Sequence, residues 1–476
     1  MIVRLRVARI LEELGQRLNP TVRSATAAQR RIRRALRPRN PAQTIAAGFL
    51  FAMFAGTMLL MLPVATPGEE SATFLEAWFT ATSALCVTGL IVVDTPTYWS
   101  GFGEGVITAL IQLGGFGVMS FSALLGVFIL GKLNLRTRVT AAAESKNSDF
   151  GDIRTLLLGI VKVSVLVEAA AAVVLFLRFW LGYGETVQEA AWNGIFHSIS
   201  AFNNAGFSLY SDSLMRYVDD WVVSLTIAGA VIIGGLGFPV LIELRKRFRR
   251  PHHWSMHTKI VLWGTAILLT AGTVFFTVVE WTNRAVFGDL DPADRLLAGF
   301  FHSVMTRTAG FNSIDVAELH PVSWLVTDIL MFIGGGPAGT AGGLKITTFA
   351  VLFFILWAEI RGDGAVNIFN KRLSRSVHRQ AIAVVLLSLA AIMCSTVFLM
   401  LITDFGQERI LFEVVSAYAT VGLSTGITAD LPAAGQVVII LLMFIGRLGP
   451  VILASSLAVR SRRTQFEYPK ERPLIG

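Results

Sequence analysis

The chain has 476 residues, of which 54% are hydrophobic and 15% are charged, and it carries a formal net charge of +9. An ordinary soluble domain has roughly 25% charged residues, so this composition argues against a soluble globular protein and favours a membrane protein. The two cysteines, Cys86 and Cys394, are too few for a disulfide framework.

The N-terminal segment, residues 1–42, contains eleven arginines and no apolar run long enough to cross a bilayer. A secretory signal would need such a run soon after its charges, so we expect this segment to stay on the inner side of the membrane. Residues 2–18 have apolar side chains at helical spacing. They predict either a helix on the inner membrane surface or a solvated basic tail.

A window that begins with Phe and ends with Gly recurs four times along the rest of the chain. In each copy the Phe lies ten residues before the Gly, and a Leu or Phe follows the Gly directly. The four glycines are Gly89, Gly206, Gly310 and Gly422, separated by 117, 104 and 112 residues. This period is longer than that of a solenoid repeat and leaves room for two membrane helices. The sequence therefore predicts four copies of one membrane unit.

Each unit is predicted to contain an outer apolar span, a short re-entrant segment that ends at the repeat glycine, and an inner apolar span. The outer spans exceed the ~18 residues that cross a bilayer. They are residues 45–64, 156–180, 260–281 and 381–403. The re-entrant segment of the first unit, residues 73–87, is too short to cross and predicts a half-helix followed by extended backbone. The inner spans share a glycine-rich interruption, which begins at Gly114, Gly234, Gly334 and Gly446.

Positive charge is concentrated in the segments that link one unit to the next and in the two terminal segments. Residues 1–42, 131–154, 243–259, 360–379 and 460–476 hold 32 of the 41 lysines and arginines but 9 of the 32 acidic residues. The positive-inside rule places these segments in the cytoplasm. The predicted protein is therefore a multi-pass protein of the cell inner (cytoplasmic) membrane with both termini in the cytoplasm.

The predicted fold class is an all-α membrane protein with eight spans. Its four pseudo-symmetric repeats each consist of an outer helix, a re-entrant pore half-helix with a filter loop, and an inner helix. The predicted segments are a basic N-terminal segment at 1–42, pore repeats at 43–134, 150–246, 256–362 and 376–460, and a cytoplasmic tail at 461–476.

Four re-entrant loops around one axis would form rings of carbonyl oxygens that replace the hydration shell of a cation. Glycine supplies the positive φ that aims successive carbonyls at the axis, and the C-terminal ends of the half-helices add partial negative charge. The sequence thus predicts a cation pore. Its filter residues are Val87, Thr88, Gly89, Asn204, Ala205, Gly206, Thr308, Ala309, Gly310, Thr420, Val421 and Gly422.

Residues 334–343 contain six glycines and one proline. Each Gly costs about 1 kcal/mol and each Pro about 3 kcal/mol inside a helix, so the inner helix of the third unit should break here into a flexible loop that gates the pore. Arg447 lies at the corresponding depth in the fourth unit and is predicted to face the pore as a cationic barrier, with a structural salt bridge as the alternative. The predicted gate residues are Gly334, Gly335, Gly336, Pro337, Ala338, Gly339, Thr340, Ala341, Gly342, Gly343, Lys345 and Arg447.

Several motifs resemble the Trk/Ktr/HKT superfamily of potassium transporters. The filter-like loops are Cys86-Val-Thr-Gly89-Leu, Asn203-Asn-Ala-Gly206-Phe-Ser, Arg307-Thr-Ala-Gly310-Phe-Asn and Ala419-Thr-Val-Gly422-Leu-Ser-Thr. The glycine-rich stretch after Gly334 and the motif Ile445-Gly-Arg447-Leu-Gly-Pro450 resemble the same superfamily, so the resemblance covers residues 45–460. Trk-type members carry two further N-terminal spans, which the basic segment cannot provide. The chain therefore resembles the KtrB-type membrane subunit.

The resemblance implies uptake of potassium, often aided by sodium. Gly89 stands where a Ser accompanies sodium transport in plant members, so potassium and rubidium should be preferred over sodium. Because Asn203, Asn204 and Arg307 have no equivalents in the first or fourth loop, the filter should be less selective than one built from four equal strands.

The resemblance also implies a homodimer that sits on a cytosolic KtrA-type regulatory ring, which binds ATP or ADP. Residues 131–154, 245–259 and 361–379 would touch the ring, and residues 474–476 would dock into the dimer contact. In this chain we expect no cofactor and no bound nucleic acid, only potassium as the transported ion at the filter carbonyls. Residues 339–345 lack the Gly-Lys-Ser/Thr of a phosphate loop, so nucleotide binding by this chain is not expected.

Two other functions are alternatives to a cation pore. A sodium-coupled secondary transporter of another small solute would have inverted repeats, which the recurrence of basic segments on one side disfavours. A membrane enzyme would need converging reactive groups, but Lys162, Glu168, Asp328, Lys345 and Arg447 are scattered. We therefore predict that the chain is not an enzyme.

The histidines gave no strong metal motif. His197 and His302 occupy different positions in their half-helices, so we interpret them as structural. His252, His253 and His257 lie in a basic connection, where metal binding is an alternative to a simple solvated segment.

Overall fold

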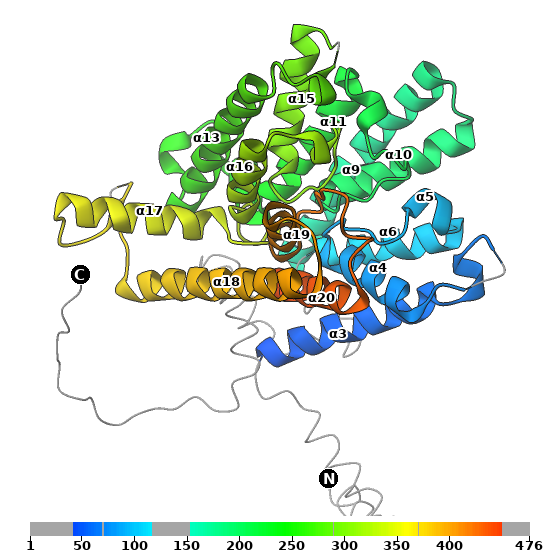
Figure 1. The fold of residues 1–476 in the computed structure, drawn as a ribbon. Helices are drawn as coiled ribbons and strands as arrows, with labels where there is room; N and C mark the ends of the chain where they lie inside the picture. The colour runs from blue at the N-terminus through cyan, green and yellow to red at the C-terminus, as the bar shows by residue number, and fades with distance from the viewer. Residues whose placement is uncertain (1–40, 69–70, 117–152, 289, 370, 450–476) are drawn as a thin grey trace, which may run out of the picture.

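The computed structural model describes residues 41–68, 71–116, 153–288, 290–369 and 371–449 (Figure 1). These residues are almost entirely helical, as predicted. A short antiparallel hairpin of β1 (Asn367–Ile368) and β2 (Lys371–Arg372), in the connection between the third and fourth units, departs from this prediction. Most of the predicted N-terminal segment, of the first connection and of the C-terminal tail lies outside the described residues.

The four predicted outer spans correspond to long helices. These are α3 (Pro41–Leu60), α9 (Ile153–Tyr183), α13 (Met256–Val279) and α18 (Arg375–Ile402). Segments of α9, α13 and α18 are long and apolar enough to cross a membrane, and only 28%, 28% and 22% of their most apolar windows are buried. Apolar side chains exposed over whole helix faces are typical of contact with lipid.

The re-entrant segments form four helices of 13 to 16 residues, too short to cross a bilayer. They are α4 (Phe74–Cys86), α10 (Val187–Phe202), α15 (Pro292–Met305) and α19 (Gln407–Ala419). Capping boxes start the first two: Thr73 pairs with Glu76, and Thr186 pairs with Glu189. All four helices carry an acidic residue in the first turn, which suits the positive end of the helix dipole.

The inner spans differ from one another. The first and fourth are α6 (Gly101–Gly115) and α20 (Ala433–Leu448). The third is interrupted between α16 (Pro321–Phe332) and α17 (Ile346–Arg361), which confirms the predicted break. The second bends by 96° between α11 (Trp221–Leu236) and α12 (Phe238–Arg247), at Gly237 with φ 90°. This bend was not predicted.

The helices close into a ring (Figure 1). Three of the half-helices pack against the outer and inner helix of their own unit, and α15 packs against its outer helix α13. Each inner helix also contacts the half-helix of the following unit: α6 contacts α10, α11 contacts α15, and α16 contacts α19. The last inner helix, α20, contacts the first half-helix, α4. Sequence order is therefore also the order around the ring.

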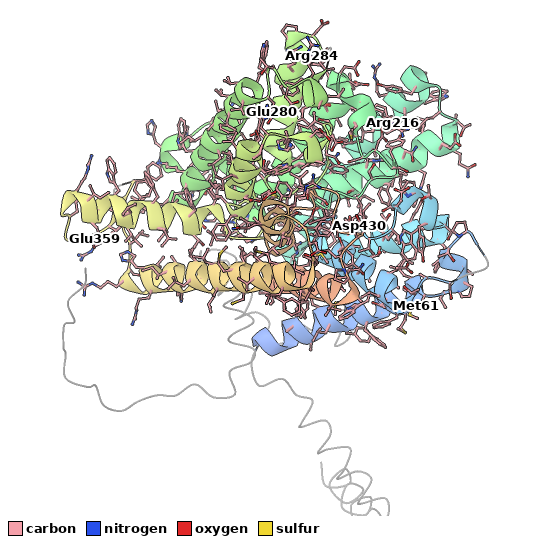
Figure 2. The ribbon with its side chains drawn as sticks, viewed as in Figure 1. Met61, Arg216, Glu280, Arg284, Glu359 and Asp430 are labelled. Atoms are coloured by element: carbon pink, nitrogen blue, oxygen red, sulfur yellow. The ribbon has the colours of Figure 1, made fainter. Side chains whose placement is uncertain are left out.

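Short helices occupy the connections. They are η1 (Pro63–Ala65), α5 (Thr95–Tyr98), η2 (Met215–Tyr217), η3 (Pro251–His253), α14 (Arg284–Phe287) and η4 (Val316–Glu318). Figure 2 shows Glu359, near the projecting end of α17, on the opposite side of the molecule from Met61 and Arg216. The molecule thus has two separate faces, one at each end of the ring.

Glycines of the inner helices touch the ends of the half-helices. In units one, two and four, a Cβ added to the first glycine of the interruption would lie within 3.0 Å of a half-helix carbonyl oxygen. The pairs are Gly114 with Leu85, Gly234 with Phe202, and Gly446 with Tyr418. Each of these carbonyls belongs to the residue four positions before the repeat glycine. The recurrence of the glycine-rich interruptions therefore has a packing cause.

This packing predicts different effects for two glycines of α11. Gly234→Ala should lower the free energy of unfolding by about 1–3 kcal/mol or more, because its methyl group would overlap with backbone. Gly229, on the same helix, has no neighbouring atom within 4 Å of an added Cβ, so Gly229→Ala should be neutral or stabilising by up to about 1 kcal/mol. Thermal unfolding of both purified variants in detergent measures the difference, and equal melting temperatures would contradict the packing argument.

Candidate ion pathway

The four loops after the half-helices share one backbone conformation. The repeat glycines have positive φ angles of 91°, 70°, 79° and 98° in Gly89, Gly206, Gly310 and Gly422. Two residues earlier each loop has a second positive φ, of 55°, 58°, 66° and 53°, in Val87, Asn204, Thr308 and Thr420. A non-glycine residue in this region costs of order 1–3 kcal/mol. Because all four loops carry a residue with this strained φ, the function of the loops must require the pair of positive φ angles.

The four glycines face one another in a closed cycle. A Cβ on any of them would lie within 3.0 Å of the carbonyl oxygen of the residue that precedes the next glycine. The contacts run from Gly89 to Ala205, from Gly206 to Ala309, from Gly310 to Val421, and from Gly422 back to Thr88. Only glycine permits this approach, both because of its φ and because of the space. The structure thus brings all twelve predicted filter residues into one ring of backbone.

Serines hold the loops to their own half-helices. The backbone N–H groups of Gly89 and Gly422 donate to Ser83 Oγ and Ser416 Oγ, both at 3.1 Å. Ser200 occupies the same position in the second loop and donates to Phe207 O at 2.8 Å. These serines were not among the predicted site residues, although a Ser six positions before the repeat glycine recurs in three of the four windows.

A cavity of about 380 Å³ opens over the ring and is lined by all four repeat glycines. Three carboxylates also line it: Asp94, Asp212 and Asp315. Asp212 forms an ion pair with Arg216 at 2.7 Å, but among the described residues Asp94 and Asp315 form none, and such carboxylates raise the local concentration of cations. These acids were not among the predicted site residues, although they lie five, six and five positions after the repeat glycines of the first three units.

Three threonine hydroxyls of the ring lack a protein partner. The Oγ1 atoms of Thr88, Thr308 and Thr420 are buried and have no hydrogen bond among the described residues. An unpaired buried hydroxyl costs about 1–3 kcal/mol. The cost is reduced if a cation or its water contacts these oxygens, which fits an ion path through the ring.

The predicted gate segment folds back against the ring from the other side. Ile333 and Leu344 form an isolated parallel bridge, and Gly334 N donates to Leu344 O at 2.8 Å. Gly336 N donates to Gly235 O at 2.8 Å, which ties the segment to the bend of the second unit. Its other contacts reach the second and fourth filter loops. Thr340 Oγ1 lies 2.9 Å from the Asn204 amide, and a Cβ on Gly342 would overlap with Thr420 Oγ1.

Basic side chains secure this segment. Arg307 Nη2 donates to Gly334 O at 3.1 Å, and Lys345 Nζ donates to Ala341 O. Arg447 is 8% exposed and donates to the carbonyls of Thr340 and Gly114. No acid pairs with Arg447 within the part of the chain that the structure describes, so the alternative of a structural salt bridge is wrong there. Arg447 instead joins the gate segment to the inner helix of the first unit.

The remaining polar residues noted in the sequence are two half-helix histidines, His197 and His302, and two charged residues of the helices, Lys162 and Asp328. His197 is bonded at both ring nitrogens, to Asn193 O at 2.8 Å and to Ser208 Oγ at 3.0 Å, as a structural residue would be. His302 Nε2 lies 3.4 Å from Thr327 Oγ1. Among the described residues no group of three or more His, Cys, Asp or Glu side chains could hold a metal ion. Lys162 and Asp328 lie on different helices, α9 and α16.

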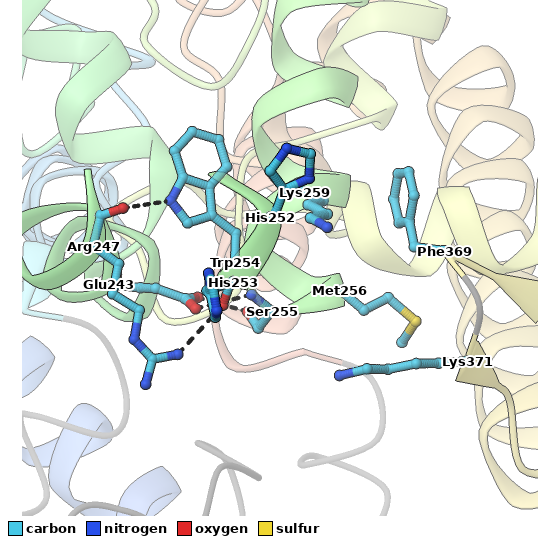
Figure 3. Close-up of a pocket in the computed structure, with 10 residues that line it drawn as sticks. All are labelled: Glu243, Arg247, His252, His253, Trp254, Ser255, Met256, Lys259, Phe369 and Lys371. Carbon is cyan, nitrogen blue, oxygen red and sulfur yellow. Dashed lines mark hydrogen bonds between the residues drawn. The ribbon is translucent and has the colours of Figure 1, made fainter. Parts of the chain in front are cut away.

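A basic pocket lies where two of the connections between units meet (Figure 3). The cavity measures about 520 Å³, and its basic lining residues include Arg247, Lys259 and Lys371. Glu243 also lines it, but its carboxylate already accepts hydrogen bonds from Ser255 and Thr258. Two of the three connections expected to contact a partner, residues 245–259 and 361–379, are thus brought together in one positively charged surface.

Outward apolar helices, a ring of backbone carbonyls and an acidic cavity above it define a membrane transport protein for cations. The chain belongs to the TrkH family of cation transport proteins, whose family model matches residues 21–464.

Individual relatives support this assignment. The chain is 40% identical over 443 residues to the Ktr system potassium uptake protein B of Bacillus subtilis (strain 168), covering 92% of this chain and 97% of that protein. It is 39% identical over 435 residues to the protein of the same name from Vibrio alginolyticus, covering 90% and 93%. The crystal structure of the potassium transporter TrkH from Vibrio parahaemolyticus matches with a TM-score of 0.65 at 20% identity, over 87% of this chain and 85% of that chain.

The predicted resemblance to the Trk/Ktr/HKT superfamily, and to its KtrB-type members, is confirmed by these matches. The chain is an integral membrane protein and a potassium uptake transporter of this family. The relatives are transport proteins and not enzymes, which is consistent with the prediction that this chain is not an enzyme.

Proposed function

We propose that potassium crosses the inner membrane along the axis of the glycine ring, through a pore of four repeats and eight spans. The observation that carries this proposal is the closed cycle of contacts from Gly89 through Gly206, Gly310 and Gly422 back to Gly89. Carbonyls arranged in rings around an axis can replace the hydration shell of potassium. The filter is formed by the twelve predicted loop residues, and both chain termini lie in the cytoplasm.

The alternative is a sodium-coupled transporter of another small solute. Such a protein would place its site between inverted repeats. Here the inner helix of each unit contacts the half-helix of the next in the same sense all the way around. This arrangement favours one axial path over a site between two inverted halves.

The filter proposal predicts a change in ion preference for one substitution. Gly89→Ser places a side chain against Ala205 O at a φ of 91°, which should lower the ratio of potassium to sodium permeability by about tenfold, a loss of about 1.4 kcal/mol in discrimination. Leu90→Val only trims a buried side chain and should change the ratio much less. Permeability ratios are measured in reconstituted vesicles.

Gly184→Ser is the matched control for that experiment, because Gly184 has a φ of 71° but no atom within 4 Å of an added Cβ. Its backbone strain is similar, and the ring is untouched. An unchanged ratio in Gly89→Ser, or an equal fall in Gly184→Ser, would remove the filter assignment.

We further propose that residues 334–343, with Lys345 and Arg447, gate the pore. The segment presses against the bases of the second and fourth filter loops and is held there by Arg307 and Arg447. In its position below the ring the segment would obstruct the pore axis, and release of the segment would open the pore. Arg447 adds a positive charge at this level.

The gate proposal predicts that Arg447→Gln raises potassium flux. Hydrogen bonds to charged groups contribute about 1.5–3 kcal/mol each, so losing those to Thr340 and Gly114 should raise the flux at least about fivefold. Arg284→Gln, at an exposed arginine of α14, serves as the control and should leave the flux unchanged. Vesicle flux without any partner subunit measures both, and a well-folded Arg447→Gln with unaltered flux would count against gating.

Control by a partner is the last part of the proposal. Two relatives are named as Ktr system proteins, and we propose that this chain forms a homodimer on a KtrA-type cytosolic ring that binds ATP or ADP. The basic pocket around Lys259 and Lys371 would receive acidic groups of that ring.

This docking surface predicts charge-reversal effects. The double variant Lys259→Glu/Lys371→Glu should lose co-purification with a KtrA-type subunit and the nucleotide response of the flux. Arg284→Glu, on the other face, should keep both. If the double variant binds the ring and responds to nucleotide as the unmodified protein does, the pocket is not the docking surface.

A further inference from the structure

An acidic side chain is buried behind the second filter loop. Glu168 belongs to α9 and is the only acidic residue in the described parts of the four outer helices, α3, α9, α13 and α18. Its side chain is 8% exposed. Ionisable groups at membrane depth are rare and usually mark functional positions. The proposed filter and gate make no use of Glu168.

A chain of amide hydrogen bonds connects Glu168 to the loop. Asn203 Nδ2 donates to Gln112 Oε1 at 2.9 Å and to Glu168 Oε1 at 3.2 Å. Gln112 Nε2 donates to both carboxylate oxygens of Glu168, at 3.1 and 3.3 Å. The network thus joins the inner helix of the first unit, the outer helix of the second, and the second filter loop.

The direction of these bonds makes the Glu168 carboxyl group the shared acceptor of two amides. Gln112 uses its oxygen to accept from Asn203, so only its nitrogen remains to face Glu168. Both oxygens of Glu168 then accept hydrogen bonds. Loss of an acceptor oxygen at position 168 would leave an amide N–H of this network unpaired.

Among the described residues, the packed helices α6, α10 and α11 bring no Lys or Arg side chain to Glu168. α11 carries no charged residue, and α6 carries only Glu104, which accepts from Trp192. α10 carries Glu189 in its first turn and His197, whose ring nitrogens are bonded elsewhere. No salt bridge to Glu168 occurs among the residues that the structure describes.

Asn203 links Glu168 to the ring. It caps the C-terminus of α10 and directly precedes Asn204, Ala205 and Gly206. Its side-chain oxygen lies against the backbone of Gly115, where a Cβ would overlap with it. The amide is therefore held by Ile199 O of its own helix at 2.9 Å, by α6 and by Glu168, and it has little freedom to move.

We infer that Glu168 is a positioning and specificity-determining residue of the second filter loop. It fixes Asn203 through the amide network, and the fixed loop in turn sets how tightly the ring binds a monovalent cation. This inference rests on the proposed function, because it assumes that the cation passes through the ring.

The test is the concentration dependence of potassium uptake by the full chain in reconstituted vesicles. Glu168→Gln keeps the shape but replaces one of the two acceptor oxygens with a donor, and it should raise the apparent KM for potassium about tenfold, the order expected when a buried hydrogen bond that positions the loop is lost. The maximal rate should stay within about twofold. Ser164→Ala is the matched control: Ser164 is buried one turn away on α9 and bonds only to Ile160 O, so its KM should not change.

A charge swap provides the second measurement. The double variant Glu168→Gln/Gln112→Glu moves the carboxylate across the same hydrogen bond, and its KM should return to within about threefold of the unmodified protein. If Glu168→Gln fails to fold, the KM of the double variant alone tests the inference. A raised KM in the swap, or an unchanged KM in a folded Glu168→Gln, overturns the inference, as does a loss confined to maximal rate and melting temperature. Absence of potassium uptake by the unmodified protein would instead refute the proposed function.

Discussion

Four peptide backbones can approach one axis at membrane depth only where no side chain comes between them. This constraint governs the ring, because each repeat glycine lies against a carbonyl of the next loop and has no room for a Cβ. It also governs the support of the ring, where Gly114, Gly234 and Gly446 lie against half-helix carbonyls. Irregular backbone within a bilayer must be buried in protein or line a wet cavity. Here the glycines allow both conditions to be met. They let the backbone pack closely against protein, and they leave loop carbonyls free to line the cavity.

The four loops of the ring have the same backbone conformation, but different side chains hold each loop in place. The residue three positions before the repeat glycine is Cys86, Asn203, Arg307 or Ala419. Asn203 donates a hydrogen bond to Gln112 of the first unit, and Arg307 donates one to Gly334 of its own unit. The first and fourth loops rely on Ser83 and Ser416 within their own half-helices. The four loops therefore share a backbone shape but differ in the side chains whose loss would disturb them.

Local signals in the sequence were enough to predict the half-helices and the broken third span. The predicted segment 73–87 became α4, Phe74–Cys86, with a capping box at its start and Val87 as its left-handed cap. The cost of glycine and proline predicted the interruption after Phe332. Both features depend on residues close together in the chain, which is why they could be read without a structure.

Features that depend on distant residues could not be predicted. Gln112, Glu168 and Asn203 are separated by 35 to 91 positions, so nothing local links them. The bend at Gly237 falls in the predicted glycine-rich interruption that begins at Gly234, but the other units carry such an interruption too, so the sequence did not indicate a bend of 96° in this unit. The shared Phe is also less uniform than its spacing suggests. Phe79, Phe196 and Phe412 are fully buried, but in the third unit the following residue, Phe301, takes that place, because α15 ends five residues before Gly310.

The composition of the proposed gate sets the energy scale on which it could work. Residues 334–343 contain no side chain larger than Thr or Pro, so burial of apolar surface contributes little to their closed position. Their contacts include backbone hydrogen bonds, hydrogen bonds donated by Arg307, Lys345 and Arg447, and the contact of Thr340 with the Asn204 amide. Bonds to charged groups are worth about 1.5–3 kcal/mol each, and moving an equilibrium from 1:99 to 99:1 takes about 5.5 kcal/mol. A segment held by a few such bonds is therefore stable when closed and still within the range that the binding of a cytosolic partner could shift.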